Sequence, residues 1–212
     1  MKPLILASGS PRRAKILRDL GIDFEIVKTD APEVSLPHDP EGTVLANARA
    51  KLLAAAVALE RDPPAALSTE RAILAADTIV WFAGKIYGKP RDLAEAKAFL
   101  RELSGNTHIV FTGIAYHPSP LTHHPSPSPS PSPSPFTLHL SPPLTACARS
   151  EVHFRPLSDA TIDEYIARVC PLDRAGAYDI DESGDLIVDS YTGEYENIMG
   201  LPVEPLRRFG II

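Results

Sequence analysis

The sequence predicts an α/β protein, because short apolar strands and capped amphipathic helices alternate along most of its 212 residues. Residues 3–7 are an apolar run that is typical of a buried strand. Ser10 and Pro11 then supply an N-cap and a first-turn proline for a helix that ends at Gly21. A chain of this length can bury a large core, and we expect one domain over residues 1–212.

The remaining elements follow from the same signals. Asp39 and Pro40 repeat the cap-and-proline pattern before a long alanine-rich helix that reaches about Leu59. Runs of β-branched and apolar residues predict strands over residues 24–27, 72–82, 85–87, 107–116, 146–154 and 186–189. Amphipathic spacing predicts further helices over residues 92–103, 159–169 and 202–209.

A proline- and serine-rich insertion at about residues 117–143 interrupts this pattern. Serine and proline alternate without a break from Pro125 to Pro135. Proline lacks an amide donor and disfavours helix in the residue before it, so neither a helix nor a central strand is expected. We interpret the segment as a disordered insertion at the tip of a hairpin, with a ligand for a proline-binding domain as the alternative.

Composition and charge are those of an ordinary globular protein, with 44% apolar and 23% charged residues. No fully apolar run approaches the roughly 20 residues that span a bilayer, and the N-terminus turns polar too early for a secretion signal. Cys147 and Cys170 have no metal-like or redox-like spacing. We expect a cytoplasmic protein without a membrane partner. The net charge of −6 argues against stable nucleic-acid binding.

The first candidate site lies between the first strand and the first helix. Small residues there let a ligand approach the backbone, and the amides at a helix start can bind an anion. Ser8 and Ser10 add hydroxyl groups, while Arg12 and Arg13 add guanidinium groups that suit phosphate. The segment indicates either a phosphate-binding loop or a helix start with two solvated arginines.

The second candidate is Asp77, a carboxylate inside the apolar strand at residues 72–82. Burying a carboxylate is costly unless it is paired, hydrogen-bonded or bound to a metal. Apolar residues continue on both sides, which favours a functional group over a cap at a strand end. A buried carboxylate near a divalent cation can activate water for hydrolysis of a phosphoanhydride.

Six short motifs, taken together, resemble those of the Maf family in order and spacing. They are residues 8–13, 76–78, 88–90, 103–105, 173–178 and 199–202. The resemblance covers the whole chain except the Ser-Pro segment. It implies a cytoplasmic nucleoside triphosphate pyrophosphatase with an elongated, mixed-sheet Maf/ITPase-like fold, in which two lobes flank a central cleft.

The resemblance also implies roles for individual residues. Asp77 matches the proposed proton acceptor that activates water, and Glu33 helps it to bind a divalent cation, Mg²⁺ or Mn²⁺. The nucleoside triphosphate is the expected partner, and a second copy of the chain is an open alternative. The residues expected to face the triphosphate are Ser8, Ser10, Arg13, Lys51 and Lys89.

Base preference depends on three positions that differ between branches of the family. The dTTP/UTP branch has Arg, Thr and Gln there, and the 7-methyl-GTP branch has Trp, Gln and Glu. Arg12 and Thr78 match the first branch, whereas Asp181 replaces its Gln and, when ionised, can only accept hydrogen bonds. dTTP and UTP are the leading substrates. Two alternatives stay open: another base, such as 7-methyl-guanine or hypoxanthine, and a non-catalytic nucleotide-binding regulator of septum formation.

Overall fold

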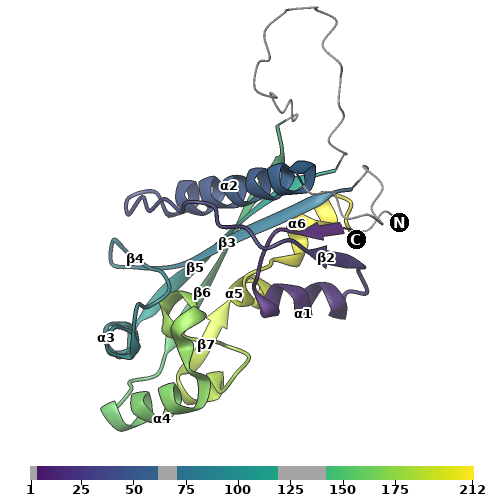
Figure 1. The fold of residues 1–212 in the computed structure, drawn as a ribbon. Coiled ribbons are helices and arrows are strands. Elements are labelled where there is room, and N and C mark those ends of the chain that lie inside the picture. The colour runs from purple at the N-terminus through teal and green to yellow at the C-terminus, as the bar shows by residue number, and fades with distance from the viewer. Residues whose placement is uncertain (1–3, 62–70, 119–141) are drawn as a thin grey trace, which may run out of the picture.

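One mixed sheet of seven strands organises the computed structural model, which describes residues 4–61, 71–118 and 142–212 (Figure 1). The strand order is β2-β1-β3-β5-β6-β7, and β4 also pairs with β3. The first three strands of this order are parallel and the other pairs are antiparallel. The strands are β1 Leu4–Leu6, β2 Phe24–Ile26, β3 Ile73–Phe82, β4 Lys85–Tyr87, β5 Thr107–His117, β6 Leu144–Phe154 and β7 Val188–Thr192.

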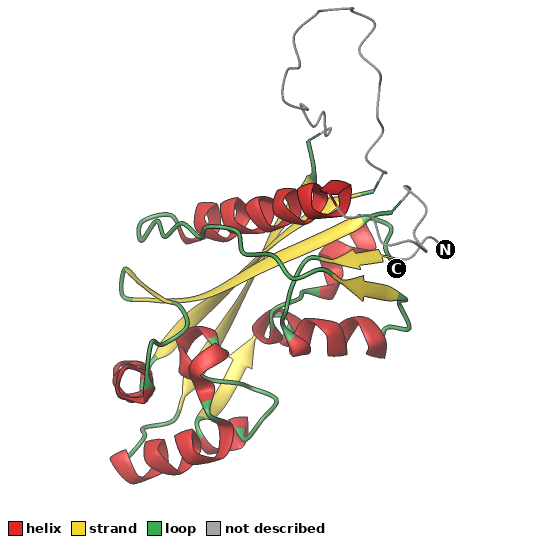
Figure 2. Cartoon of the chain, viewed as in Figure 1, coloured by secondary structure: helices red, strands yellow, loops and turns green. Residues whose placement is uncertain are grey.

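Helices cover both faces of this sheet (Figure 2). Side chains alternate between the faces along a strand, so β3 packs against a different set of helices at odd and even positions. Ile73 and Ala75 belong to the core beneath α2, whereas Leu74 and Ala76 pack in the core that contains α1 and α6. The helices are α1 Pro11–Asp19, α2 Pro40–Arg61, α3 Leu93–Leu103, α4 Asp159–Val169, α5 Tyr195–Met199 and α6 Val203–Arg208.

A third core lies at the far end of β3. Val80 packs there with Phe99 of α3, Tyr165 of α4 and Phe154 of β6. This core and the one around α1 lie on the same face of β3, because Val80 and Ala76 are both at even positions. The two cores form the two lobes that the fold class predicts.

Helix α2 combines a buried stripe with an apolar composition. Its residues 40–59 are long and apolar enough to cross a membrane by length and mean hydropathy, 1.3. However, Val44, Ala48, Leu52 and Ala55 are fully or almost fully buried, and α2 packs along the sheet (Figure 1). The apolar stripe of α2 therefore serves the core of this structure.

The sheet has a gap beside the middle of β3. On one edge of β3, β1 pairs with Ile73 and Leu74, and β4 pairs with Val80, Trp81 and Phe82. Within the described part of the chain, no strand pairs with residues 75–79 on this edge. The other edge is continuous, because β5 pairs with β3 from Ile73 to Trp81, including Asp77 opposite Gly113. Asp77 thus lies at the centre of the gap.

Comparison with the sequence confirms the mixed α/β class and most of the expected elements. Ser10 precedes α1 in an extended conformation but makes no side-chain cap; instead, its amide donates to Ser8 Oγ. The late strand begins at Val188 rather than at residue 186. Helix α5 was not predicted, because it spans little more than one turn. The predicted insertion falls outside the described residues except at its ends.

Candidate active site

A cavity of about 750 Å³ opens at the gap in the sheet, a volume typical of small-molecule sites. Its walls come from the loop after β1, helix α2, the middle of β3, the segment after β4, and residues 173–178. Every candidate residue from the sequence lines it except Asp181. Those lining it are Ser8, Ser10, Arg12, Arg13, Glu33, Lys51, Asp77, Thr78 and Lys89.

Asp77 is a buried carboxylate, only 6% exposed, and it points toward α2. Its Oδ1 accepts a hydrogen bond from Lys51 Nζ at 2.5 Å, and its Oδ2 accepts one from Asn47 Nδ2 at 3.0 Å. These two donors compensate the loss of hydration that burial imposes on the charge. Asp77 is therefore held in one orientation at the cavity wall.

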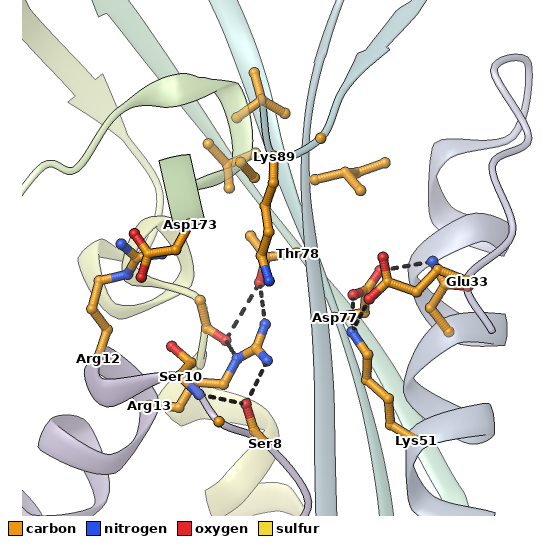
Figure 3. Close-up of a pocket in the computed structure, with 18 of the residues that line it drawn as sticks. Ser8, Ser10, Arg12, Arg13, Glu33, Lys51, Asp77, Thr78, Lys89 and Asp173 are labelled. Atoms are coloured by element: carbon orange, nitrogen blue, oxygen red, sulfur yellow. Dashed lines mark hydrogen bonds and ion pairs between the residues drawn. The ribbon is translucent and has the colours of Figure 1, made fainter. Parts of the chain in front are cut away.

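Lys51 joins the two candidate carboxylates. Its ammonium group lies 2.7 Å from Glu33 Oε1 and 2.5 Å from Asp77 Oδ1 (Figure 3). The Glu33 side chain is 57% exposed and belongs to the loop before α2, whereas Asp77 is buried in β3. Lys51 thus brings an accessible carboxylate beside a buried one.

Asn47 is a site residue that the sequence reasoning missed. Besides its bond to Asp77, its Nδ2 donates to Val34 O at 3.1 Å and its Oδ1 accepts from Val34 N at 2.8 Å. Asn47 therefore links the loop that contains Glu33 to Asp77, the carboxylate that also pairs with Lys51. The signal was its position four residues before Lys51, which places both side chains on one face of α2.

Arg13 is 8% exposed and uses its guanidinium group inside the protein. Its Nη1 donates to Ser8 Oγ at 2.9 Å, its Nη2 to Thr78 Oγ1 at 3.0 Å and its Nε to Gly200 O at 2.8 Å. Burial lowers the pKa of Arg13 to about 10, against the opposing charge of Asp77, so the group is still cationic at neutral pH. The contacts of Arg13 organise the loop that starts α1, and its contact with a triphosphate stays a prediction.

Thr78 lies on the opposite face of β3 from its neighbour Asp77 (Figure 3). Its Oγ1 is 3.0 Å from Thr112 Oγ1, and Thr112 in turn donates to Asn197 O at 3.1 Å. Figure 3 shows Lys89 extending from the segment after β4 toward Thr78. The face of β3 that carries Thr78 is thus tied to α5 and bordered by a lysine.

The cavity has one more cation than the sequence reasoning assigned to it. Lys28, in the loop after β2, lines the wall beside Gly9. A Cβ built on Gly9 would lie 3.7 Å from the Lys28 side chain, so Gly9 and Lys28 are close neighbours. Lys28 adds a positive charge next to the loop that precedes α1.

The two aspartates after Tyr178 lie in different surroundings. Asp179 Oδ2 accepts a hydrogen bond from Arg12 Nη1 at 2.9 Å. Asp181, the expected third base-reading position, does not line the cavity; its Oδ1 accepts from Tyr195 OH at 3.2 Å. The structure brings Arg12 and Thr78 to the cavity but not Asp181, whose role in base choice stays a prediction.

Comparison with known proteins identifies the family. The model of the Maf-like protein family matches residues 3–209. The dTTP/UTP pyrophosphatase of Bacillus cytotoxicus is 38% identical over 98% of this chain and 94% of that protein. The dTTP/UTP pyrophosphatase of Geotalea uraniireducens is 37% identical over 99% and 96%, respectively. A HAM1 protein structure from Coxiella burnetii aligns over 73% of each chain at 16% identity, with a TM-score of 0.42. The family model and these relatives match almost the whole chain and lead to one conclusion: the chain belongs to the Maf family.

Proposed function

We propose that this protein is a nucleoside triphosphate pyrophosphatase that hydrolyses dTTP and UTP to the monophosphate and pyrophosphate. The observation that carries this proposal is the oriented Asp77 carboxylate at the wall of a cation-lined cavity. The relatives named dTTP/UTP pyrophosphatase, which share most of their length with this chain, support the same reaction and substrates.

The cations around the cavity suit a polyphosphate. Arg13, Lys28, Lys51 and Lys89 line it, although the whole chain carries a net charge of −6. The positive lining is therefore local, as a site for a small anion requires. Lysine and arginine donors would neutralise the charge that develops on the phosphate oxygens during cleavage.

Asp77 would act as the general base. A water beside its carboxylate gives up a proton to Asp77 while the water oxygen attacks a phosphorus of the α–β linkage. The bond from that phosphorus to the bridging oxygen breaks, and pyrophosphate and the monophosphate separate. Asn47 and Lys51 keep the carboxylate aimed during this step, because each donates to a different oxygen of Asp77.

Glu33 and Asp77 would hold the divalent cation, Mg²⁺ or Mn²⁺. Within the described residues, no cluster of three or more His, Cys, Asp or Glu side chains is suited to a metal ion. Two carboxylates nevertheless fit Mg²⁺, which usually takes its other ligands from water and substrate phosphates. When bound, the cation would supply charge neutralisation at the phosphates.

A pyrophosphate-release assay over UTP, dTTP, CTP, ITP and 7-methyl-GTP, with Mg²⁺ or Mn²⁺, tests this function. We expect UTP and dTTP to give the highest kcat/KM and pyrophosphate as the product. Nucleotide binding without turnover would favour the regulator alternative. Release of orthophosphate would show cleavage at the β–γ bond and contradict the proposal, and a purine nucleotide at the head of the panel would contradict the substrate assignment.

A further inference from the structure

Asp179 is a second buried carboxylate, and the proposed reaction does not use it. It is 5% exposed, and its two oxygens accept three hydrogen bonds. Oδ2 accepts from Arg12 Nη1 at 2.9 Å and from Arg174 Nε at 2.9 Å, and Oδ1 accepts from the amide of Asp181 at 2.9 Å. Asp179 thus pairs with Arg12, which lines the cavity, without lining the cavity itself.

The backbone around this carboxylate is anchored as well. The amide of Asp179 donates to Tyr165 OH at 2.7 Å, and that hydroxyl donates back to Asp179 O at 3.2 Å. Tyr165 belongs to α4 and is fully buried. Asp179 therefore presents its charge to Arg12 from a fixed point in the lobe opposite α1.

The charge of Asp179 is maintained by its partners. Burial alone would raise the pKa of Asp179, but the positive charge of Arg12 and the hydrogen bonds from Asp181, Arg12 and Arg174 together lower it. Asp179 is ionised at neutral pH, so the guanidinium of Arg12 belongs to an ion pair. The Arg12 side chain keeps 23% exposure, and it still lines the cavity.

An arginine in such a pair prefers a different ligand from an unpaired one. Asp179 offsets the positive charge of Arg12 and would repel a phosphate that approached it. The remaining N–H groups of Arg12 can still donate to a neutral carbonyl oxygen. Uracil and thymine present two carbonyl groups, whereas cytosine replaces one of them with an amino group, which would face the Arg12 donors.

We propose that Asp179 is a specificity-determining positioning residue that reserves Arg12 for the carbonyl groups of a pyrimidine base and keeps the polyphosphate away from it. This inference rests on the proposed function. The Arg12–Asp179 pair thus combines attraction of the base carbonyl groups with repulsion of a polyphosphate that enters the base position.

Binding of non-hydrolysable α,β-methylene analogues of UTP and CTP, measured by calorimetry, tests the proposal. In wild type we expect the UTP analogue to bind at least about tenfold more tightly than the CTP analogue, the effect of one mismatched polar contact. Asp179→Ala should reduce this ratio to below about threefold, because the Arg12 guanidinium is no longer held in its orientation by Asp179. Glu182→Ala is the matched control, since Glu182 pairs with Arg174 Nη2 at 3.1 Å and has no contact with Arg12. It should keep the wild-type ratio.

A second variant and a second ligand keep the test valid if Asp179→Ala does not fold. Asp179→Asn retains the shape and removes the charge, so Arg12 becomes a free cation. We expect Asp179→Asn to bind inorganic pyrophosphate several-fold more tightly than wild type, and Glu182→Ala to bind it as wild type does. Equal or weaker pyrophosphate binding by Asp179→Asn would overturn the proposal.

A double-mutant cycle separates an effect through Arg12 from a general one. Asp179→Ala should change the UTP-to-CTP ratio in wild type but not in an Arg12→Ala background, since coupled residues are not additive. The same change in both backgrounds would overturn the proposal. Because these readouts measure binding, they stand even if wild type releases no pyrophosphate. That failure would refute the proposed function and leave the role of Asp179 to be decided by these ratios.

Discussion

Replacing Asp77 with asparagine should nearly abolish turnover and also destabilise the fold. The variant loses the proposed general base, a loss of about 10²–10⁴-fold in kcat. The structure adds a second effect. Both oxygens of Asp77 accept from donors, Lys51 Nζ and Asn47 Nδ2, so an amide must turn its own NH₂ toward one of them.

The donor that meets this NH₂ loses one of its acceptors at a buried position, because Lys51 keeps only Glu33 and Asn47 Nδ2 keeps only Val34 O. An unsatisfied buried polar group costs about 1–3 kcal/mol. In a protein of this size, each kcal/mol lowers Tm by about 2–4 °C. We therefore expect Asp77→Asn to be folded, almost inactive and several degrees less stable than wild type.

Pyrophosphate release and thermal denaturation, measured on the same sample, test both effects. Asp163→Asn is the matched control, because Asp163 carries the same group in an exposed pair with Lys97. This control should leave turnover and Tm close to wild type, as is usual for surface ion pairs. Turnover of Asp77→Asn within threefold of wild type would refute the general-base assignment. An unchanged Tm would refute the donor argument.

Three further predictions follow from the contacts of the site and the core. Asn47→Ala should lower kcat/KM at least about tenfold, since it frees both Asp77 and the Glu33 loop; an Arg49→Ala control on the exposed side of α2 should not. Gly113→Ala should cost about 1–3 kcal/mol in urea denaturation, because a Cβ there would lie 2.6 Å from the backbone of Val44; an unchanged midpoint would contradict this. Burial, with a smaller effect from His153, lowers the pKa of His108 from 6.5 to about 3. Between pH 6.5 and pH 3 the imidazole of His108 therefore binds a proton in the unfolded chain but not in the folded protein. Its contribution to stability is complete above pH 6.5 and falls by up to about 1.4 kcal/mol per pH unit toward pH 3. His108→Gln should therefore lose less stability than wild type between pH 7 and pH 5, and an equal loss would exclude His108 as the cause.

Asp77 could be predicted from sequence because its signal is local: a charge inside an apolar strand. The loop before α1 was predictable for the same reason, since its small and basic residues are contiguous. Asn47 shares one face of α2 with Lys51, but its contact with Asp77 depends on how closely α2 approaches the sheet, which Gly113 of β5 permits. The spacing within α2 does not state that distance.

Which aspartate meets Arg12 was also beyond the sequence. The chain before Asp179 turns through left-handed conformations at Gly176 and Ala177, with φ of 69° and 60°. Such turns decide the direction of the following side chains without leaving a periodic pattern. Residue type therefore indicated that a carboxylate lies in this segment, but not that Asp179 would face Arg12 while Asp181 turns to Tyr195.

Because β1 and β4 both pair with β3, the number of β3 residues between them fixes the length of the gap in the sheet. The last pair with β1 is at Leu74 and the first pair with β4 is at Val80, so six residue steps, roughly 20 Å, separate the two anchor points. One inserted residue between them would lengthen the opening by about 3.3 Å and would turn every later side chain to the other face. If the insertion preceded Asp77, the carboxylate would leave α2 and its partners Asn47 and Lys51. Spacing along this stretch thus sets both the length of the gap in the sheet and the face of the sheet to which Asp77 points.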